Sequence, residues 1–132
     1  MGTVYTGSTV VKTDPDRVFE FLRVPENQTR WGTKFVRSTK PLGDGRYEME
    51  TPLGRMVYRV DAEPVRRIVD FVFETPGGES ILPARVVPHA RGAIVTFTIT
   101  RAPGTSDEDW DRGMVNLDEE LIELKRLVEV AG

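Results

Sequence analysis

Cysteine is absent from this 132-residue sequence, and histidine occurs once, as His89. A chain without cysteine forms no disulfide, has no thiolate nucleophile and offers no cysteine ligands for zinc. A serine hydrolase also needs a histidine base, but His89 stands between Pro88 and Ala90 in a stretch typical of a hairpin turn. We therefore interpret His89 as a turn residue, and the sequence predicts no metal site.

Long hydrophobic runs and phosphate-binding loops are also missing. No stretch approaches the roughly 20 apolar residues of a membrane-spanning helix, and no basic segment followed by an apolar one marks a secretion signal. The glycines at 43, 45, 77 and 78 fall in expected hairpin turns rather than ahead of a helix, so no nucleotide cofactor is predicted. From these absences we expect a cytoplasmic protein with no membrane span and no cofactor.

Charge of one sign is not concentrated anywhere in the chain. The formal net charge is -3, and the 18 basic residues are interspersed with 21 acidic ones. Nucleic-acid binding needs a basic surface, so no nucleic-acid partner is expected. The length and the ordinary composition, 39% hydrophobic and 30% charged, predict one globular domain over residues 1–132.

The clearest pattern that is present runs from residue 105 to residue 130. An apolar side chain recurs there every third or fourth residue, at Trp110, Met114, Leu117, Leu121, Leu124 and Val128. This spacing predicts one long helix with a single apolar face, which must pack against the preceding residues. Thr105 and Glu108 are placed to form a capping box at its start. Gly113 costs about 1 kcal/mol relative to alanine inside a helix, and indicates a bend or a close contact with a sheet.

Residues ahead of this helix alternate between polar and apolar over short stretches separated by glycine and proline. Strands are predicted at 4–12, 35–40, 46–51, 55–62, 68–74, 80–88 and 93–100. Asp14-Pro15-Asp16 is typical of a helix start, and two short helices are expected between the first two strands. The predicted fold is α+β, with a seven-stranded antiparallel sheet wrapped around the long C-terminal helix.

Three segments resemble those of one superfamily. Residues 14–22 (DPDRVFEFL) resemble its opening helix, 25–27 with Trp31 resemble the following segment, and 92–97 (GAIVTF) resemble its last strand. In this order they resemble the START-like, or polyketide-cyclase (SRPBCC), superfamily over nearly the whole chain. The resemblance implies a helix-grip fold with a cavity between sheet and helix. Members bind lipids, sterols, hormones, polyketides or other hydrophobic molecules, some are cyclases or aromatases, and no catalytic motif is common to all.

We accordingly expect the cavity to bind a small hydrophobic or amphipathic molecule that is lipid-, polyketide- or aromatic-like. Aromatic and methionine side chains suit an adaptable pocket, although the same side chains are also typical of a plain core. The predicted ligand-binding residues are Trp31, Tyr47, Met49, Met56, Tyr58, Phe71, Phe73, Arg85, Trp110, Met114 and Leu117. Arg85 contacts a ligand carboxylate or carbonyl if it points inward, and lies on a bent edge strand if it points outward.

An enzyme is the alternative. The charged strand residues are predicted on the outer face as cross-strand ion pairs; they are Glu48, Glu50, Arg55, Arg59, Asp61, Asp70 and Glu74. On the inner face they would instead support a cyclase, aromatase or dehydratase that uses acid–base chemistry without metal or nucleotide. The sequence identifies no catalytic residue. An interaction module that uses its surface is a third hypothesis, and a homodimer is compatible with all three.

Overall fold

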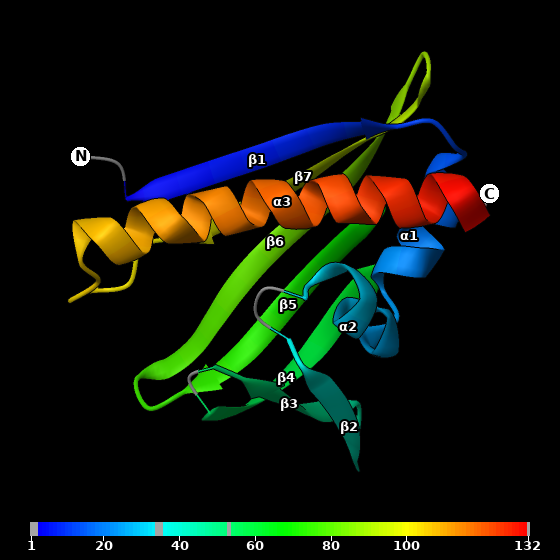
Figure 1. The fold of residues 1–132 in the computed structure, drawn as a ribbon. Coiled ribbons are helices and arrows are strands. Elements are labelled where there is room, and N and C mark those ends of the chain that lie inside the picture. The colour runs from blue at the N-terminus through cyan, green and yellow to red at the C-terminus, as the bar shows by residue number, and fades with distance from the viewer. Residues whose placement is uncertain (1–2, 34–35, 53, 132) are drawn as a thin grey trace.

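The computed structural model describes residues 3–33, 36–52 and 54–131 (Figure 1). Within these residues the elements are β1 (Val4–Val11), α1 (Pro15–Leu22), the 3-10 turn η1 (Pro25–Asn27), α2 (Gln28–Trp31), β2 (Ser38–Gly43), β3 (Arg46–Thr51), β4 (Gly54–Glu63), β5 (Ile68–Thr75), β6 (Gly78–His89), β7 (Gly92–Thr100) and α3 (Asp107–Ala131). The predicted α+β fold is confirmed, including the short helices after β1. The expected start of the second strand at residue 35 lies outside the described residues.

The strands form one antiparallel sheet in the order β1-β7-β6-β5-β4-β3-β2. From β2 to β7 each strand pairs with the next one along the chain, and β7 also pairs with β1, the first strand. The edges of the sheet are therefore β1 and β2. Figure 1 shows the strand direction turning across the sheet, from β1 almost along α3 to β5 running steeply across it.

Helix α1 begins as the sequence predicts. The backbone N–H of Asp16 donates to Oδ1 of Asp14 at 2.8 Å, and Pro15 occupies the first turn. This cap satisfies a donor that the helix itself leaves unpaired. The apolar face of α1 is buried against the sheet, and each fully buried side chain of this kind stabilises the fold by about 1.5–3 kcal/mol.

The cap of α3 lies one residue later than predicted. The backbone N–H of Asp109 donates to Oγ of Ser106 at 3.1 Å, so Ser106 caps the helix. Thr105 belongs to the preceding turn, because its carbonyl accepts a hydrogen bond from the Arg101 guanidinium at 2.6 Å. Helix α3 has 25 residues, but no helix in the described part of the chain is both long and apolar enough to cross a membrane.

The long helix is held against the edge strand β1. A Cβ atom at Gly7 would lie 2.9 Å from Cδ1 of Leu121, so a larger residue here would require side chains of α3 to shift. The hydroxyl of Tyr5 donates to Oδ1 of Asp118 at 2.8 Å, and Nζ of Lys125 donates to the carbonyl of Val10 at 2.8 Å. Because α3 is fixed along β1 at one side of the curved sheet, space remains between the helix and the middle strands.

The outer face of the sheet carries ion pairs, as the alternating pattern predicts. Arg46 pairs with Glu74 across 2.9 Å, and Nη1 of Arg59 lies 2.7 Å from Oε2 of Glu79. These side chains are largely exposed, so each pair contributes about 0–1 kcal/mol to stability. The charged strand residues therefore make the outer face of the sheet polar, whereas apolar side chains cover the inner face.

Candidate functional site

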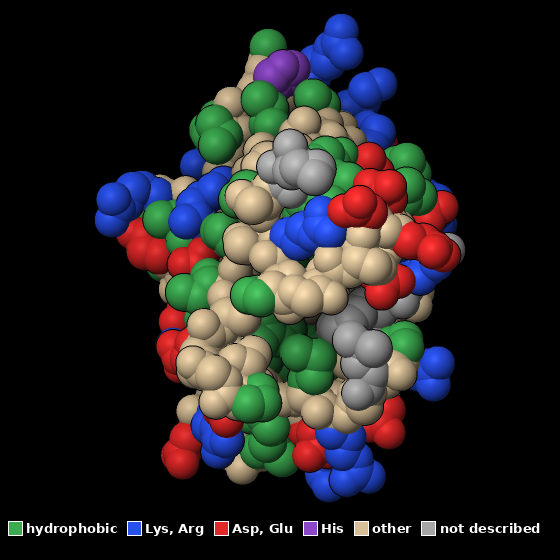
Figure 2. All heavy atoms as spheres, turned by 90° about the vertical axis from the view of Figure 1, so that its left-hand side faces the viewer, with side chains coloured by type: hydrophobic (Ala, Val, Ile, Leu, Met, Phe, Trp, Pro, Cys, Tyr) green, Lys and Arg blue, Asp and Glu red, His purple; other side chains and the backbone are tan. Residues whose placement is uncertain are grey.

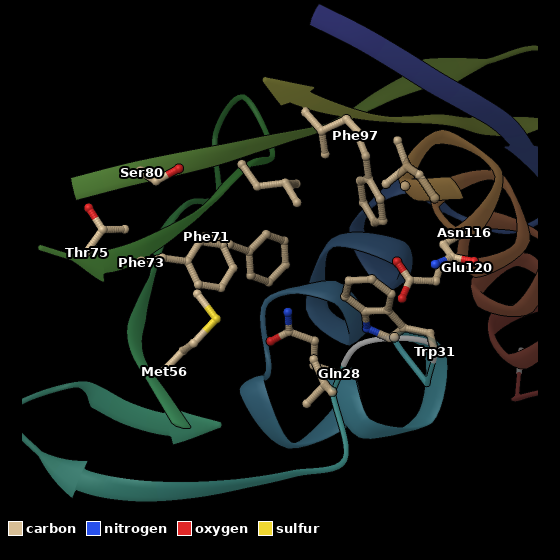
Figure 3. Close-up of a pocket in the computed structure, with 16 residues that line it drawn as sticks. Gln28, Trp31, Met56, Phe71, Phe73, Thr75, Ser80, Phe97, Asn116 and Glu120 are labelled. Atoms are coloured by element: carbon tan, nitrogen blue, oxygen red, sulfur yellow. The ribbon is translucent and has the colours of Figure 1, made fainter. Parts of the chain in front are cut away.

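A cavity of about 340 Å³ lies between α3, α2 and the inner face of strands β4 to β7 (Figure 3). This volume falls at the lower end of the range of about 300–1,000 Å³ that is usual for ligand sites. Figure 2 looks at the side of the molecule where α3 begins and the β5–β6 hairpin ends, and shows a hollow with hydrophobic side chains at its base. The apolar lining residues are Trp31, Val36, Met56, Phe71, Phe73, Leu82, Phe97, Ile99 and Leu117.

Aromatic side chains form the inner wall. The two-residue period of β5 directs Phe71 and Phe73 to the same face of the sheet. Trp31 reaches this wall from α2, with its ring centroid 5.9 Å from that of Phe71 in an edge-on arrangement and 5.2 Å from that of Phe97. Such contacts hold the rings in fixed positions, which gives the cavity a preformed shape.

Helix α2 is one turn long and ends abruptly at Gly32. The N–H of Gly32 donates to the carbonyl of Gln28 at 2.7 Å, and a Cβ at Gly32 would lie 2.9 Å from the same carbonyl oxygen. Glycine is therefore needed where the chain leaves α2 beside the cavity. The result is that Gln28 and Trp31, three residues apart on one short helix, both line the cavity.

Two buried polar atoms of residues that line the cavity have no partner. Oε1 of Gln28 and Nε1 of Trp31 are buried and form no hydrogen bond with any described residue, and the two side chains belong to residues only 6% and 4% exposed. Buried polar groups are almost always paired, and an unpaired one costs about 1–3 kcal/mol. Both residues line the cavity, but these two atoms themselves are covered by protein atoms.

Helix α3 lines the cavity with a partly polar face made by Gly113, Asn116, Leu117 and Glu120. The spacing of these four residues places them on one side of the helix. A Cβ at Gly113 would meet no atom of the described residues within 4 Å. The close contact with the sheet that the sequence indicated as one role of Gly113 is therefore not observed; the glycine leaves open space in the cavity wall.

Five of the eleven predicted ligand residues line this cavity: Trp31, Met56, Phe71, Phe73 and Leu117. Their contact with a ligand remains a prediction. Tyr47, Met49 and Tyr58 lie on β3 and β4 beyond the aromatic wall and are not among the lining residues. Met49 and Tyr58 are fully buried and belong to the hydrophobic core.

Trp110 and Met114 line a separate depression of about 510 Å³ at the N-terminal end of α3. This depression is larger than the cavity, but Arg101, Asp107 and Asp111 border it. The Arg101 guanidinium is already bound, at 2.8 Å from Oδ1 of Asp107. The depression therefore offers less apolar enclosure, and the cavity is the better candidate site.

The interpretation of Arg85 as an inward ligand residue is wrong. Its neighbours Ala84 and Val86 on β6 are fully buried, so the alternation of the strand turns Arg85 to the outer face. There Nη1 of Arg85 lies 2.8 Å from Oδ1 of Asp70 and also donates to the Ala84 carbonyl. The outward placement that the sequence left open is the observed one, but β6 is not an edge strand, because it pairs with both β5 and β7.

Tyr58 carries a buried hydroxyl that has no hydrogen-bond partner within the described ranges. Its ring stacks on Phe73, with centroids 5.9 Å apart, behind the cavity wall. Burial raises the pKa of Tyr58 well above its ordinary value, and the charge of Glu26 raises it further. The neutral phenol is thus held in a site that offers it no polar contact.

Replacing Tyr58 with phenylalanine is expected to stabilise the protein by about 1 kcal/mol, because it removes an unpaired buried hydroxyl and keeps the ring. Because the folded protein holds the phenol neutral, wild-type stability falls once the unfolded chain ionises above pH about 10, and the advantage of the variant grows there. Urea unfolding at neutral and alkaline pH measures both effects. A variant less stable than wild type at neutral pH would show that the hydroxyl is paired.

No protein-family model and no curated protein sequence matches the chain. Solved structures do match its fold. A START superfamily protein from Mycobacterium smegmatis has a TM-score of 0.78 at 11% identity, covering 99% of this chain and 100% of that one. The Aha1 dimer from Colwellia psychrerythraea has a TM-score of 0.76 at 14% identity, with 98% of each chain covered.

A third similar structure is the Zhui aromatase/cyclase from a Streptomyces species, with a TM-score of 0.70 at 18% identity over 96% of this chain and 93% of that one. At such identities the likeness establishes the fold and not the activity. The chain therefore has the START-like, helix-grip fold that its sequence motifs predicted. The START superfamily protein and the Zhui aromatase/cyclase both share this fold with the chain.

Proposed function

We propose that the protein binds one compact hydrophobic or amphipathic molecule in the cavity between α3 and the sheet. The observation that carries the proposal is the cavity itself, which is enclosed by an aromatic wall and is lined mainly by apolar side chains. Protein interiors are normally packed without such space. The small volume favours a ring-sized ligand over a lipid with two acyl chains.

The alternative is a cyclase, aromatase or dehydratase that uses the same cavity. Glu120 is the observation in its favour, because it places a carboxylate, a group that can transfer protons, in the cavity wall. Glu120 is, however, the single ionisable side chain among the described lining residues. A reaction that needs both an acid and a base has one candidate group here, so binding is the function that the cavity supports better.

The two tryptophans provide a direct test, because Trp31 lines the cavity and Trp110 does not. Bromobenzene quenches tryptophan fluorescence on contact and is small enough for the cavity. In a Trp110→Phe variant we expect saturable quenching of Trp31. In the matched Trp31→Phe variant, which retains Trp110, we expect quenching that rises linearly with concentration.

Saturable quenching of neither tryptophan would contradict binding in the cavity, and saturable quenching of Trp110 alone would move the site to the other depression. Arg85→Ala is a suitable surface control, since its side chain lies on the outer face. Mass spectrometry of small molecules extracted from the natively purified protein then identifies the ligand. Turnover of that compound by the protein would favour the enzyme over the binding protein.

A further inference from the structure

The described residues that line the cavity carry charge of one sign. Glu120 is half-buried and lines the cavity from α3, and no lysine or arginine is among the lining residues that the structure describes. Basic side chains of the flanking helices make contacts elsewhere: Arg30 of α2 lies over a ring of α1, and Arg112 of α3 pairs with acids of its own helix. The ionisable group that a bound molecule meets in this wall is therefore an acid.

Aromatic rings border the same space. Trp31, Phe71 and Phe97 form a connected wall, in which the ring centroid of Trp31 lies 5.9 Å from that of Phe71 and 5.2 Å from that of Phe97. The face of an aromatic ring is electron-rich and attracts cations, and tryptophan does so best. The carboxylate and the rings thus favour the same kind of ligand group, one that is positively charged.

We propose that the ligand carries a positively charged amine, and that Glu120 binds this group beside the ring of Trp31. This inference rests on the proposed function. An ammonium group donates hydrogen bonds and accepts none, whereas a carboxylate accepts without donating, so the two match both in charge and in hydrogen bonding. A ligand with a carboxylate would instead bring a like charge into a largely apolar cavity, where repulsion is poorly screened.

The cavity has a polar side and an apolar side, which orient such a ligand. Figure 3 shows the carboxylate of Glu120 projecting from α3 toward Trp31, with the rings of β5 across the cavity. Asn116 lies one turn before Glu120 on the same face of α3, and its amide oxygen can accept a second hydrogen bond from the ammonium group. The charged end of the ligand therefore faces α3, and its apolar body lies against Phe71 and Phe73.

Glu120 need not be unpaired in order to bind the ligand. The two oxygens of a carboxylate together accept hydrogen bonds at about four positions, so an ammonium group can add to the interaction that Glu120 already makes. Thr75 and Ser80, which line the cavity where β5 and β6 meet their hairpin, are exposed and uncharged. Among the described lining residues, Glu120 is thus the one that distinguishes ligands by the sign of their charge.

The test compares three ligands of one ring and similar chain length: phenethylamine, propylbenzene and phenylpropionate. At neutral pH the first is a cation, the second is uncharged and the third is an anion. Both ions lose hydration on entering the cavity, so the ratio of their affinities reports the sign of charge that the cavity prefers. We expect calorimetric titration of the wild-type protein to show phenethylamine binding at least tenfold more tightly than phenylpropionate. Equal affinity, or a preference for phenylpropionate, overturns the inference and leaves the proposed function intact.

Two variants assign the preference to its residue. Glu120→Gln removes the charge and keeps the shape of the side chain; we expect the ratio to fall below threefold while the affinity for propylbenzene stays within about twofold of wild type. Glu119→Gln is the matched control, because it removes the same charge from an exposed position of α3 that does not line the cavity. This control should keep the wild-type ratio. A ratio retained in Glu120→Gln, or lost equally in both variants, overturns the role of Glu120.

Failure of the inference is distinguishable from failure of the proposed function. If bromobenzene or propylbenzene binds and phenethylamine does not, the inference fails and the cavity still binds ligands. If none of the four compounds binds, the proposed function fails as well. Circular dichroism confirms that each variant is folded, and the wild-type ratio tests the inference even where a variant does not fold.

Discussion

Replacing Gly113 with leucine is expected to block the cavity and to make the protein more stable. Glycine in the middle of α3 costs about 1 kcal/mol relative to a good helix former, and nothing described lies within 4 Å of the position that a Cβ would take. The leucine side chain therefore extends into open space along the cavity wall. We expect bromobenzene affinity to fall tenfold or more, which corresponds to at least about 1.4 kcal/mol of binding free energy.

Gly113→Ala is the matched control. It gives the same gain in helix stability, about 1 kcal/mol, but adds only one methyl group and should leave binding within about threefold of wild type. Urea unfolding measures stability, and quenching of Trp31 in the Trp110→Phe background measures binding. A destabilised leucine variant would show that the space at Gly113 is filled, and unchanged affinity would show that the ligand does not reach α3.

Replacing Gly92 with alanine is expected to destabilise the protein by about 3 kcal/mol or more. Gly92 opens β7 with φ at +143°, and a Cβ there would lie 2.3 Å from the carbonyl oxygen of Val11 and 2.7 Å from the backbone nitrogen of Thr13. Because these are backbone atoms of β1 and the turn that follows it, no side chain can rotate to relieve the clash. The strained backbone angle adds about 1–3 kcal/mol.

Gly78→Ala separates the two contributions. Gly78 has a similar φ of +128°, but a Cβ there meets no described atom within 4 Å. Its substitution therefore carries the backbone strain alone, which we put at about 1–2 kcal/mol. Chemical unfolding of both variants tests the comparison. Equal losses for the two would mean that β1 moves away from Gly92 without cost.

The sequence predicts the strands and the hairpin turns well because both signals are local. Alternation along Ile68–Thr75 and Gly92–Thr100 reports which face of each strand is buried, and glycine and proline mark the turns between strands. The motifs at residues 14–22 and 92–97 then identify the helix-grip arrangement. The cap of α3 is misplaced by one residue because both Thr105 and Ser106 are suitable capping residues, and only the bond to Arg101 decides between them.

The candidate site is less predictable because the cavity does not face the most apolar side of α3. The hydrophobic stripe of Trp110, Met114 and Leu121 turns toward β1, where it meets Tyr5 and Gly7. The flank with Gly113, Asn116 and Glu120 borders the cavity instead. The apolar periodicity of a helix identifies the face that packs against the rest of the protein, not the face that borders a cavity. Leu117 belongs to both of these faces of α3. Glycine inside the helix was the one local sign of the cavity-facing flank.

The function is predicted only at the level of a ligand class, and the reason is also physical. Gln28 lies in a helix of four residues with no recognisable pattern, and only the folded structure shows that it is buried and lines the cavity. Tertiary structure alone reveals which polar atoms lack partners.

The two edges of the sheet determine how copies of the chain can associate. At the end of β1, side chains of α3 form hydrogen bonds with backbone groups. Lys125 binds the carbonyl of Val10, and Glu129 accepts from the N–H of Lys12, just after the strand, at 2.8 Å. On β2, Pro41 has no N–H and the pairing register shifts next to it. Strand-by-strand polymerisation into fibres is thus obstructed at both ends. A concentrated solution of the protein should therefore resist amyloid-like aggregation.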